Sequence, residues 1–152
     1  MIPDLVDGVL PEGLHDATME AIASRFGGFQ RTNQRIRLTE RLRSYIEEAR
    51  TAGIATAVII DGSYVSQRDE PNDIDLILVL RLGHDATAEL RPFRYNILSK
   101  RMVRKTYGFD VVAVINQGRE YHKAIEYFSR VRPEDEHPYT NRPRKGLLRI
   151  LL

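Results

Sequence analysis

Apolar residues in the first third of the chain recur at helical spacing. Met19, Ile22 and Phe26 predict a short helix, which the glycines at 27 and 28 are expected to end. A longer helix, ended by Gly53, is predicted from five positions spaced as on one helix face: Leu38, Leu42, Tyr45, Ile46 and Ala49. Residues 1–10 are expected to form an extended arm, and the polar, basic residues 29–37 a connection.

Further along the chain, runs of Val, Ile and Leu bounded by turn-forming residues predict three strands, at residues 55–60, 74–80 and 109–115. A helix is expected between the last two, with Asp85 as its cap, Pro92 near its first turn and Gly108 at its end. A final helix is predicted from the spacing of four apolar residues: Tyr121, Ala124, Ile125 and Phe128.

The end of the chain has a different character. Residues 131–146 contain three prolines and mixed charges, which predicts a loop. The closing segment "GLLRILL" is expected to form either an edge strand or a segment that docks on a partner. In the second case it is also the expected contact of a homodimer.

The order of these elements is helix, helix, strand, strand, helix, strand, helix, which predicts an α/β or α+β fold. We expect a mixed sheet with helices packed mainly on one face. The length of 152 residues fits a single domain. Within residues 1–152, we expect an N-terminal arm and helices at 1–53, a core at 54–130 and a C-terminal tail at 131–152.

Composition narrows the chemistry. The chain has no cysteine, which excludes disulfides, thiolate catalysis and cysteine-based zinc sites. No stretch approaches the roughly 18 apolar residues of a membrane span, and the first residues lack the pattern of a signal peptide, so a cytoplasmic location is expected. Residues 91–105 carry six basic side chains and no acidic one. Such a block predicts either a solvated helix face or a surface for phosphate-bearing partners, including nucleic acid.

The candidate chemistry lies in "VIIDGSYVSQRDEPNDIDLILVL", residues 58–80. Because side chains alternate along a strand, Asp73 and Asp75 are expected to point the same way, and two close carboxylates favour a cation between them. Carboxylate oxygens are ligands that Mg²⁺ prefers, often together with substrate phosphates. Gly62 and Ser63 directly follow a strand and are expected to open a short helical turn whose N–H groups hold phosphate. Asp110 completes a three-carboxylate cluster if the strands at 74–80 and 109–115 are neighbours.

Gly62-Ser63, nine intervening residues, Asp73-Ile74-Asp75 and the later Asp110 resemble the signature of the polymerase-β-type nucleotidyltransferase superfamily. Within it, the chain resembles small bacterial nucleotidyltransferase-like proteins of unassigned role, some of them related to toxin–antitoxin modules. The "LPEGLHDATMEAIASRFGGF" and "KGLLRILL" segments resemble that group more loosely.

The resemblance implies a minimal nucleotidyltransferase fold, with residues 54–130 as its catalytic core. It also implies that Asp73 and Asp75 bind Mg²⁺ or Mn²⁺. Asp110 would be the third metal ligand and would help to activate the acceptor hydroxyl, while Gly62 and Ser63 would hold the β- and γ-phosphates of an NTP such as ATP.

The expected activity is the metal-dependent transfer of an NMP from an NTP to a hydroxyl of a protein, an RNA or a small molecule. Two departures from the superfamily pattern leave an alternative open. Asp61 stands where an apolar residue is usual, and is expected to be a turn residue at the strand end. The chain also lacks the helical C-terminal domain of larger relatives. The alternative is a catalytically silent binding module, acting as a toxin–antitoxin component or a nucleic-acid binder.

Overall fold

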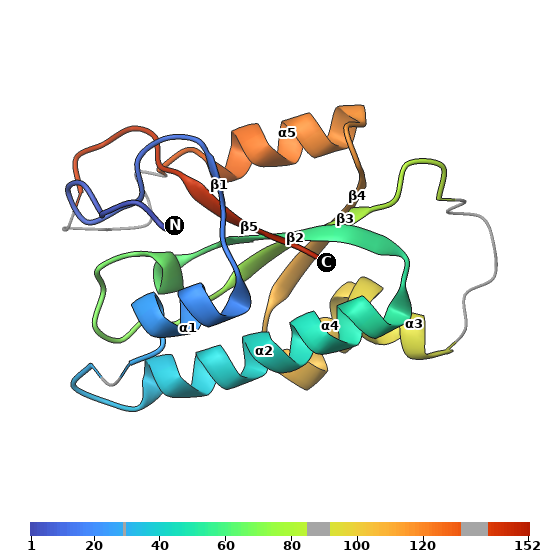
Figure 1. The fold of residues 1–152 in the computed structure, drawn as a ribbon, viewed down its shortest axis with the longest axis horizontal. Helices are drawn as coiled ribbons and strands as arrows, with labels where there is room; N and C mark the ends of the chain where they lie inside the picture. Colours follow the sequence, from blue (N-terminus) through green and yellow to red (C-terminus); the bar gives the residue numbers. More distant parts are fainter. Residues whose placement is uncertain (29, 85–91, 132–139) are drawn as a thin grey trace.

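Five strands form one mixed sheet in the computed structural model, which describes residues 1–28, 30–84, 92–131 and 140–152 (Figure 1). The order across the sheet is β1-β5-β2-β3-β4. The β2 strand pairs antiparallel with β3 and with β5, whereas β3–β4 and β1–β5 are parallel pairs. The strands are β1 (Leu14–Asp16), β2 (Ala55–Asp61), β3 (Asp75–Leu80), β4 (Asp110–Ile115) and β5 (Leu147–Leu151).

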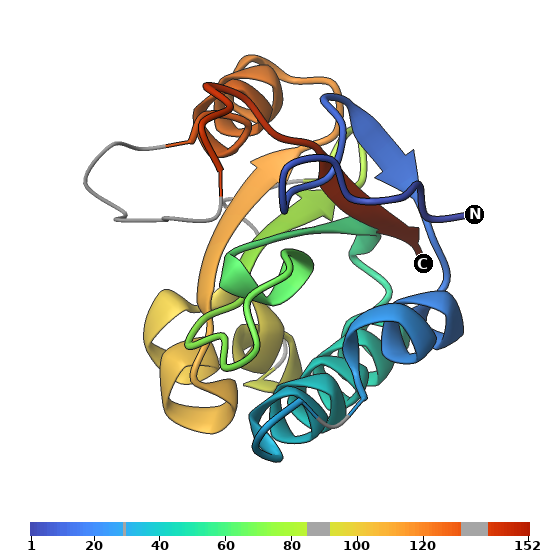
Figure 2. The same cartoon turned by 90° about the vertical axis from the view of Figure 1, so that its left-hand side faces the viewer.

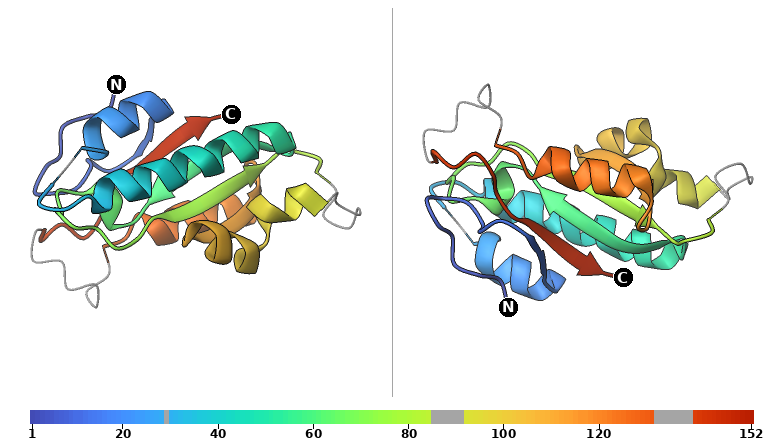
Figure 3. Two further views of the ribbon diagram at one scale, coloured as in Figure 1. Left: turned by 90° about the horizontal axis from the view of Figure 1, so that it is seen from below. Right: turned by 90° about the horizontal axis from the view of Figure 1, so that it is seen from above.

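The helices cover the two faces of this sheet unequally. Four of them lie on one face and α5 lies alone on the other (Figures 1 and 2), and the views from below and above show α2 and α5 on opposite sides (Figure 3). The helices are α1 (Met19–Phe26), α2 (Gln34–Ala52), α3 (Pro92–Leu98), α4 (Lys100–Tyr107) and α5 (Arg119–Phe128), with the short 3₁₀ turn η1 (Ser63–Val65) after β2. The predicted α/β class, with helices mainly on one face, is confirmed.

Alternating residues of each strand divide the core in two. On β2, Val58 and Ile60 belong to the larger core beneath α1 to α4, whereas Ala57 and Ile59 belong to the smaller core beneath α5. All four are nearly inaccessible to solvent. Strands buried on both faces read as continuous apolar runs, which is why β2 and β3 were predictable from sequence.

The helices begin and end where short polar residues and glycine allow. Thr18 caps α1 by accepting a hydrogen bond from the Ala21 amide, and Gly53 ends α2 in the left-handed conformation. The predicted connection at 29–37 is too long, because α2 already begins at Gln34. Periodicity missed this first turn because its buried residue is an arginine, Arg35.

The single helix expected up to Gly108 is instead two helices. Ser99 is extended and accepts a hydrogen bond from the Met102 amide, so it caps α4 and separates it from α3. The basic side chains at positions 94 and 100–105 therefore do not share one continuous helix. The predicted cap, Asp85, lies outside the described residues.

Both ends of the chain are built into the fold more tightly than expected. The predicted extended arm instead turns at Asp7 and Gly8, where Val6 and Val9 bond to each other, and it buries Val9 and Leu10. The predicted edge strand at the C-terminus is wrong, since β5 lies between β1 and β2 with hydrogen-bonded neighbours on both sides. A homodimer through this segment stays an untested prediction.

None of the described helices combines the length and apolar composition that crossing a membrane requires.

Candidate functional site

Three adjacent strands carry an aspartate at the same level of the sheet. Asp61 at the end of β2 pairs with Asp75 at the start of β3, and Asp75 pairs with Asp110 at the start of β4. Neighbouring strands lie about 4.8 Å apart, and residues paired in register present their side chains to the same face. The expected adjacency of Asp75 and Asp110 is confirmed, and Asp61 extends the pair to a row of three.

The turn after β2 is held by Asp73. Its Oδ1 accepts hydrogen bonds from the Ser63 amide, at 2.9 Å, and from the Ser63 hydroxyl. The Ser63 hydroxyl in turn accepts from the Asn72 amide at 3.1 Å. Asp73 lies before β3 rather than within it, so strand alternation does not set its direction. Asp73 and Asp75 nevertheless line the same pocket.

Gly62 is needed for packing within the protein. Its φ of 100° is a conformation that L side chains rarely adopt, and a Cβ atom there would lie 2.8 Å from the Asp73 carbonyl oxygen. The sequence predicts a role for Gly62 in a turn that holds phosphate. The close neighbour is instead the backbone at the start of β3, so a side chain at position 62 strains the fold itself.

A buried arginine holds the next part of the loop. The Arg35 guanidinium donates to the carbonyl oxygens of Tyr64 (2.7 Å), Ser66 (2.8 Å) and Phe26 (3.2 Å), and also to that of Arg68. Burial lowers its pKa, yet the carbonyl oxygens supply acceptors for its N–H donors. Through these bonds, α2 fixes the path of the chain from η1 to Arg68.

These elements surround a pocket of about 400 Å³. It is lined by four carboxylates, three cationic side chains and the polar turn, namely Asp61, Asp73, Asp75, Asp110, Arg68, Arg104, Lys145, Gly62, Ser63 and Asn72. All five residues that the sequence nominated, Gly62, Ser63, Asp73, Asp75 and Asp110, therefore lie around one pocket.

Two of the pocket's carboxylates contact cations. Arg104 Nη1 lies 3.5 Å from Asp110 Oδ1 in an exposed pair, and Lys145 Nζ lies 3.0 Å from Asp61 Oδ1 in a buried one. Burial raises the pKa of Asp61, and the nearby Lys145 ammonium opposes that rise. The pocket therefore contains one exposed ion pair and one buried ion pair.

Residues 3–151 match the model of a protein family described as a family of unknown function, DUF6932. The chain belongs to the DUF6932 family. No curated protein and no solved structure matches it. The chemistry that the pocket of this DUF6932 member can support is therefore inferred from the residues that line it.

The carboxylates are neighbours, but they do not form a closed metal centre. In the ranges that the structure describes, no three acidic or histidine side chains gather closely enough to hold a metal ion. Asp73 is turned toward Ser63, and Asp110 toward Arg104. The donor chemistry still suits a hard divalent cation, because oxygen ligands from three segments face one polar pocket.

Sequence reasoning missed Asp61 and Lys145 as a pair in this DUF6932 pocket. Asp61 was interpreted as a strand-end turn residue, but it is the last residue of β2 and is 4% exposed. Lys145 fell in a predicted loop. The parity of Ala57, Ile59 and Asp61 along β2 is the signal that places Asp61 on the same face as Asp75, whereas the contact with Lys145 depends on where β5 joins the sheet.

Proposed function

We propose that this protein is a metal-dependent nucleotidyltransferase that moves an NMP from an NTP to a hydroxyl group. The observation that carries the proposal is the meeting of Asp73, Asp75 and Asp110 with the Gly62–Ser63 turn around one pocket. Asp75 and Asp110 are direct cross-strand neighbours, and like charges in that position destabilise a sheet unless a cation compensates them.

In this proposal Asp73 and Asp75 hold Mg²⁺ or Mn²⁺, with Asp110 as a third oxygen ligand. The metal, when bound, stabilises negative charge on the transferring phosphoryl group and on the leaving pyrophosphate. Both bonds from Ser63 end on Oδ1 of Asp73, so Oδ2 can bind the metal while they persist.

The chain's own residues then supply positioning and proton transfer. The acceptor hydroxyl oxygen bonds to the α-phosphorus as the bond from that phosphorus to the bridging oxygen breaks, and pyrophosphate leaves. The Asp110 carboxylate accepts the hydroxyl proton. Asp110 is well exposed and adjoins Arg104, so an acceptor can reach it from solvent.

A second candidate, the catalytically silent binding module, is favoured by a different observation. The Arg104–Asp110 ion pair and the bonds from Ser63 to Asp73 give both of these carboxylates partners without a metal. A protein that keeps these contacts would bind a partner through the pocket or the basic α4 surface and transfer nothing.

The test is calorimetry of Mn²⁺–ATP binding to wild type and to the Asp73→Asn, Asp75→Asn variant. The proposal predicts at least a tenfold loss of affinity, roughly one charge-assisted contact or more. The matched control is Asp69→Asn, Glu70→Gln, which removes two exposed acidic groups from the same loop and should bind as wild type. Equal affinity in all three proteins would refute the proposal.

Transfer is separated from binding by a second measurement. ATP labelled at the α-phosphate, incubated with the protein and a cell extract, should leave label on a macromolecule or a small acceptor. The label should be absent with Asp73→Asn, Asp75→Asn. Tight Mn²⁺–ATP binding without any transferred label would support the silent module instead.

A further inference from the structure

Lys145 has an unusual position for a lysine. Its side chain is 17% exposed and lines the pocket, and its Nζ lies 3.0 Å from Oδ1 of the buried Asp61. The contact has the distance of an ion pair without the alignment of a hydrogen bond. An ammonium group has three N–H donors, so proximity to one carboxylate oxygen leaves donors for a second acceptor in the pocket.

The backbone on both sides of this lysine is fixed. The Lys145 amide donates to the Ser129 carbonyl oxygen at 2.8 Å, and the Gly146 amide donates to that of Leu10 at 2.9 Å. At position 146 a Cβ atom would lie 2.0 Å from the Pro11 carbonyl oxygen, so only glycine fits there. The Lys145 side chain therefore reaches the pocket from a loop whose backbone is fixed by hydrogen bonds.

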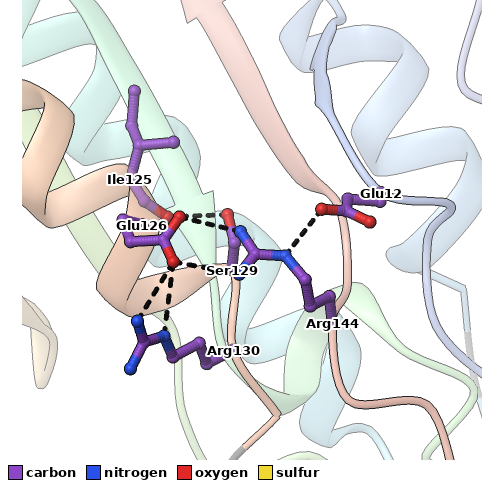
Figure 4. A network of polar contacts seen from close by, with 6 residues as sticks. All are labelled: Glu12, Ile125, Glu126, Ser129, Arg130 and Arg144. Carbon is purple, nitrogen blue, oxygen red and sulfur yellow. Dashed lines mark hydrogen bonds and ion pairs between the residues drawn. The ribbon is translucent and has the colours of Figure 1, made fainter.

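The residue before Lys145 is held from two directions. Arg144 Nε contacts Glu12 Oε1 at 2.6 Å, and Arg144 Nη2 contacts Glu126 Oε2 at 2.9 Å (Figure 4). Glu126 also pairs with Arg130 at 3.2 Å, and the hydrogen bonds from the two arginines lower the pKa of Glu126 to about 2. The network joins the N-terminal segment, α5 and the loop leading to β5 around the backbone of Lys145.

Burying the Lys145–Asp61 pair costs free energy that packing alone does not require. Removing a carboxylate and an ammonium from water costs several kcal/mol per ion, and apolar residues of similar size often serve as well for packing alone. The nearby Asp73 carboxylate adds repulsion, because, besides burial, its charge also raises the pKa of Asp61. A cation held at this point suits the binding of a polyanion.

We propose that Lys145, held in place by Asp61 and by the fixed 144–146 backbone, binds the triphosphate tail of the nucleotide. This rests on the function proposed above and adds a ligand for the phosphates beside the Gly62–Ser63 turn. Asp61 is a positioning residue in this arrangement, because it acts on the nucleotide only through Lys145.

The test compares wild type with Lys145→Met by calorimetry. It measures the affinities for Mn²⁺–ATP, for Mn²⁺–tripolyphosphate and for Mn²⁺ alone. Removing a cation should weaken binding of Mn²⁺–ATP and of Mn²⁺–tripolyphosphate by about tenfold each, since both probes carry the same phosphates. Binding of Mn²⁺ alone should be unchanged or tighter, because a positive charge beside the carboxylates has gone. A purely structural role would instead weaken the binding of Mn²⁺ alone together with that of the two phosphate probes, or change none of the three affinities.

Two further variants control for misfolding and for the loss of any one positive charge. Asp61→Asn, Lys145→Met removes the cation without leaving a buried charge unpaired, so it should fold and still show the tenfold loss. Lys123→Met, which removes an exposed lysine of α5, should bind as wild type. Wild-type affinity for both phosphate probes in the folded double variant overturns the role of Lys145.

The outcomes also separate this inference from the proposed function. Loss of tripolyphosphate binding in Lys145→Met, with normal Mn²⁺–ATP binding in Asp73→Asn, Asp75→Asn, supports the lysine and refutes the metal site. The reverse pattern supports the metal site and refutes the lysine. If wild type binds neither Mn²⁺–ATP nor Mn²⁺–tripolyphosphate, both the metal site and the role of Lys145 are refuted.

Discussion

Arg144 and Lys145 are neighbours in the chain, yet their ion pairs lie in different surroundings. Arg144 contacts Glu12 and Glu126 at the surface, where water and salt screen the charges. Lys145 contacts Asp61, whose side chain is 6% exposed, at the wall of a pocket. The comparison shows that the length of an ion pair does not by itself indicate how much the pair contributes to stability. The shorter contact, at 2.6 Å, is the exposed one, but the buried one has the larger consequence when it is broken.

The largest expected effect in this comparison follows from Lys145→Met. The Asp61 charge would stay buried without its partner, which should lower the free energy of unfolding by about 3–5 kcal/mol. Urea unfolding measures this loss. Adding Asp61→Asn should restore most of it, because the variant then has neither charge. If the double variant is as unstable as the single one, packing of the lysine stem rather than the unpaired charge is responsible.

A smaller effect is expected at the turn beside the buried pair. Gly62→Ala places a Cβ atom 2.8 Å from the Asp73 carbonyl oxygen at a φ of 100°. Such backbone strain costs about 1–3 kcal/mol, to be measured as the change in the free energy of urea unfolding. Gly28→Ala is the control, since a Cβ there meets no atom within 4 Å. Equal stability of the two variants would contradict the packing assigned to Gly62.

The smallest effect belongs to the exposed network of Glu126, and its size should depend on pH. The pKa of Glu126 is about 2 in the folded protein and about 4.5 as its ordinary value. A depressed pKa contributes stability that is complete above the ordinary value and is lost as the pH falls toward about 2. The melting temperature of wild type should therefore exceed that of Glu126→Gln near neutral pH.

That difference in melting temperature should shrink as the pH falls from about 4.5 to about 2. Glu120→Gln, on the same helix, is the control, and its difference from wild type should be small throughout. A constant difference between wild type and Glu126→Gln down to about pH 2 would show that the ion pairs of Glu126 add nothing to stability.

What could be predicted from sequence depended on how local the determining interactions are. The β2, β3 and β4 strands are continuous apolar runs, and the neighbouring positions of Asp75 and Asp110 followed from expecting two such strands side by side. The break at Ser99 was also local, but a serine inside a basic helix carries a weak signal. Ser99 is a cap because its side chain bonds the Met102 amide.

The pair that completes the pocket was not predictable in the same way. Asp61 and Lys145 are far apart in sequence, and they meet because β5 inserts between β1 and β2 instead of lying at an edge. Nothing in a single sequence fixes that order of strands. Arg35 was missed for a related reason, since its buried position depends on carbonyl oxygens from two other segments, the end of α1 and the chain that follows β2.

The central claim is that the aspartates and the lysine meet a metal–triphosphate in one pocket. A crystal structure with Mn²⁺ and a non-hydrolysable ATP analogue, using the anomalous signal of manganese, tests it most directly. The account predicts manganese within about 2.0–2.6 Å of carboxylate oxygens of Asp73, Asp75 and Asp110. It also predicts a phosphate oxygen within about 3 Å of Lys145 Nζ. Manganese or nucleotide bound elsewhere, with Asp73 still bonded to Ser63 and Asp110 to Arg104, would contradict it.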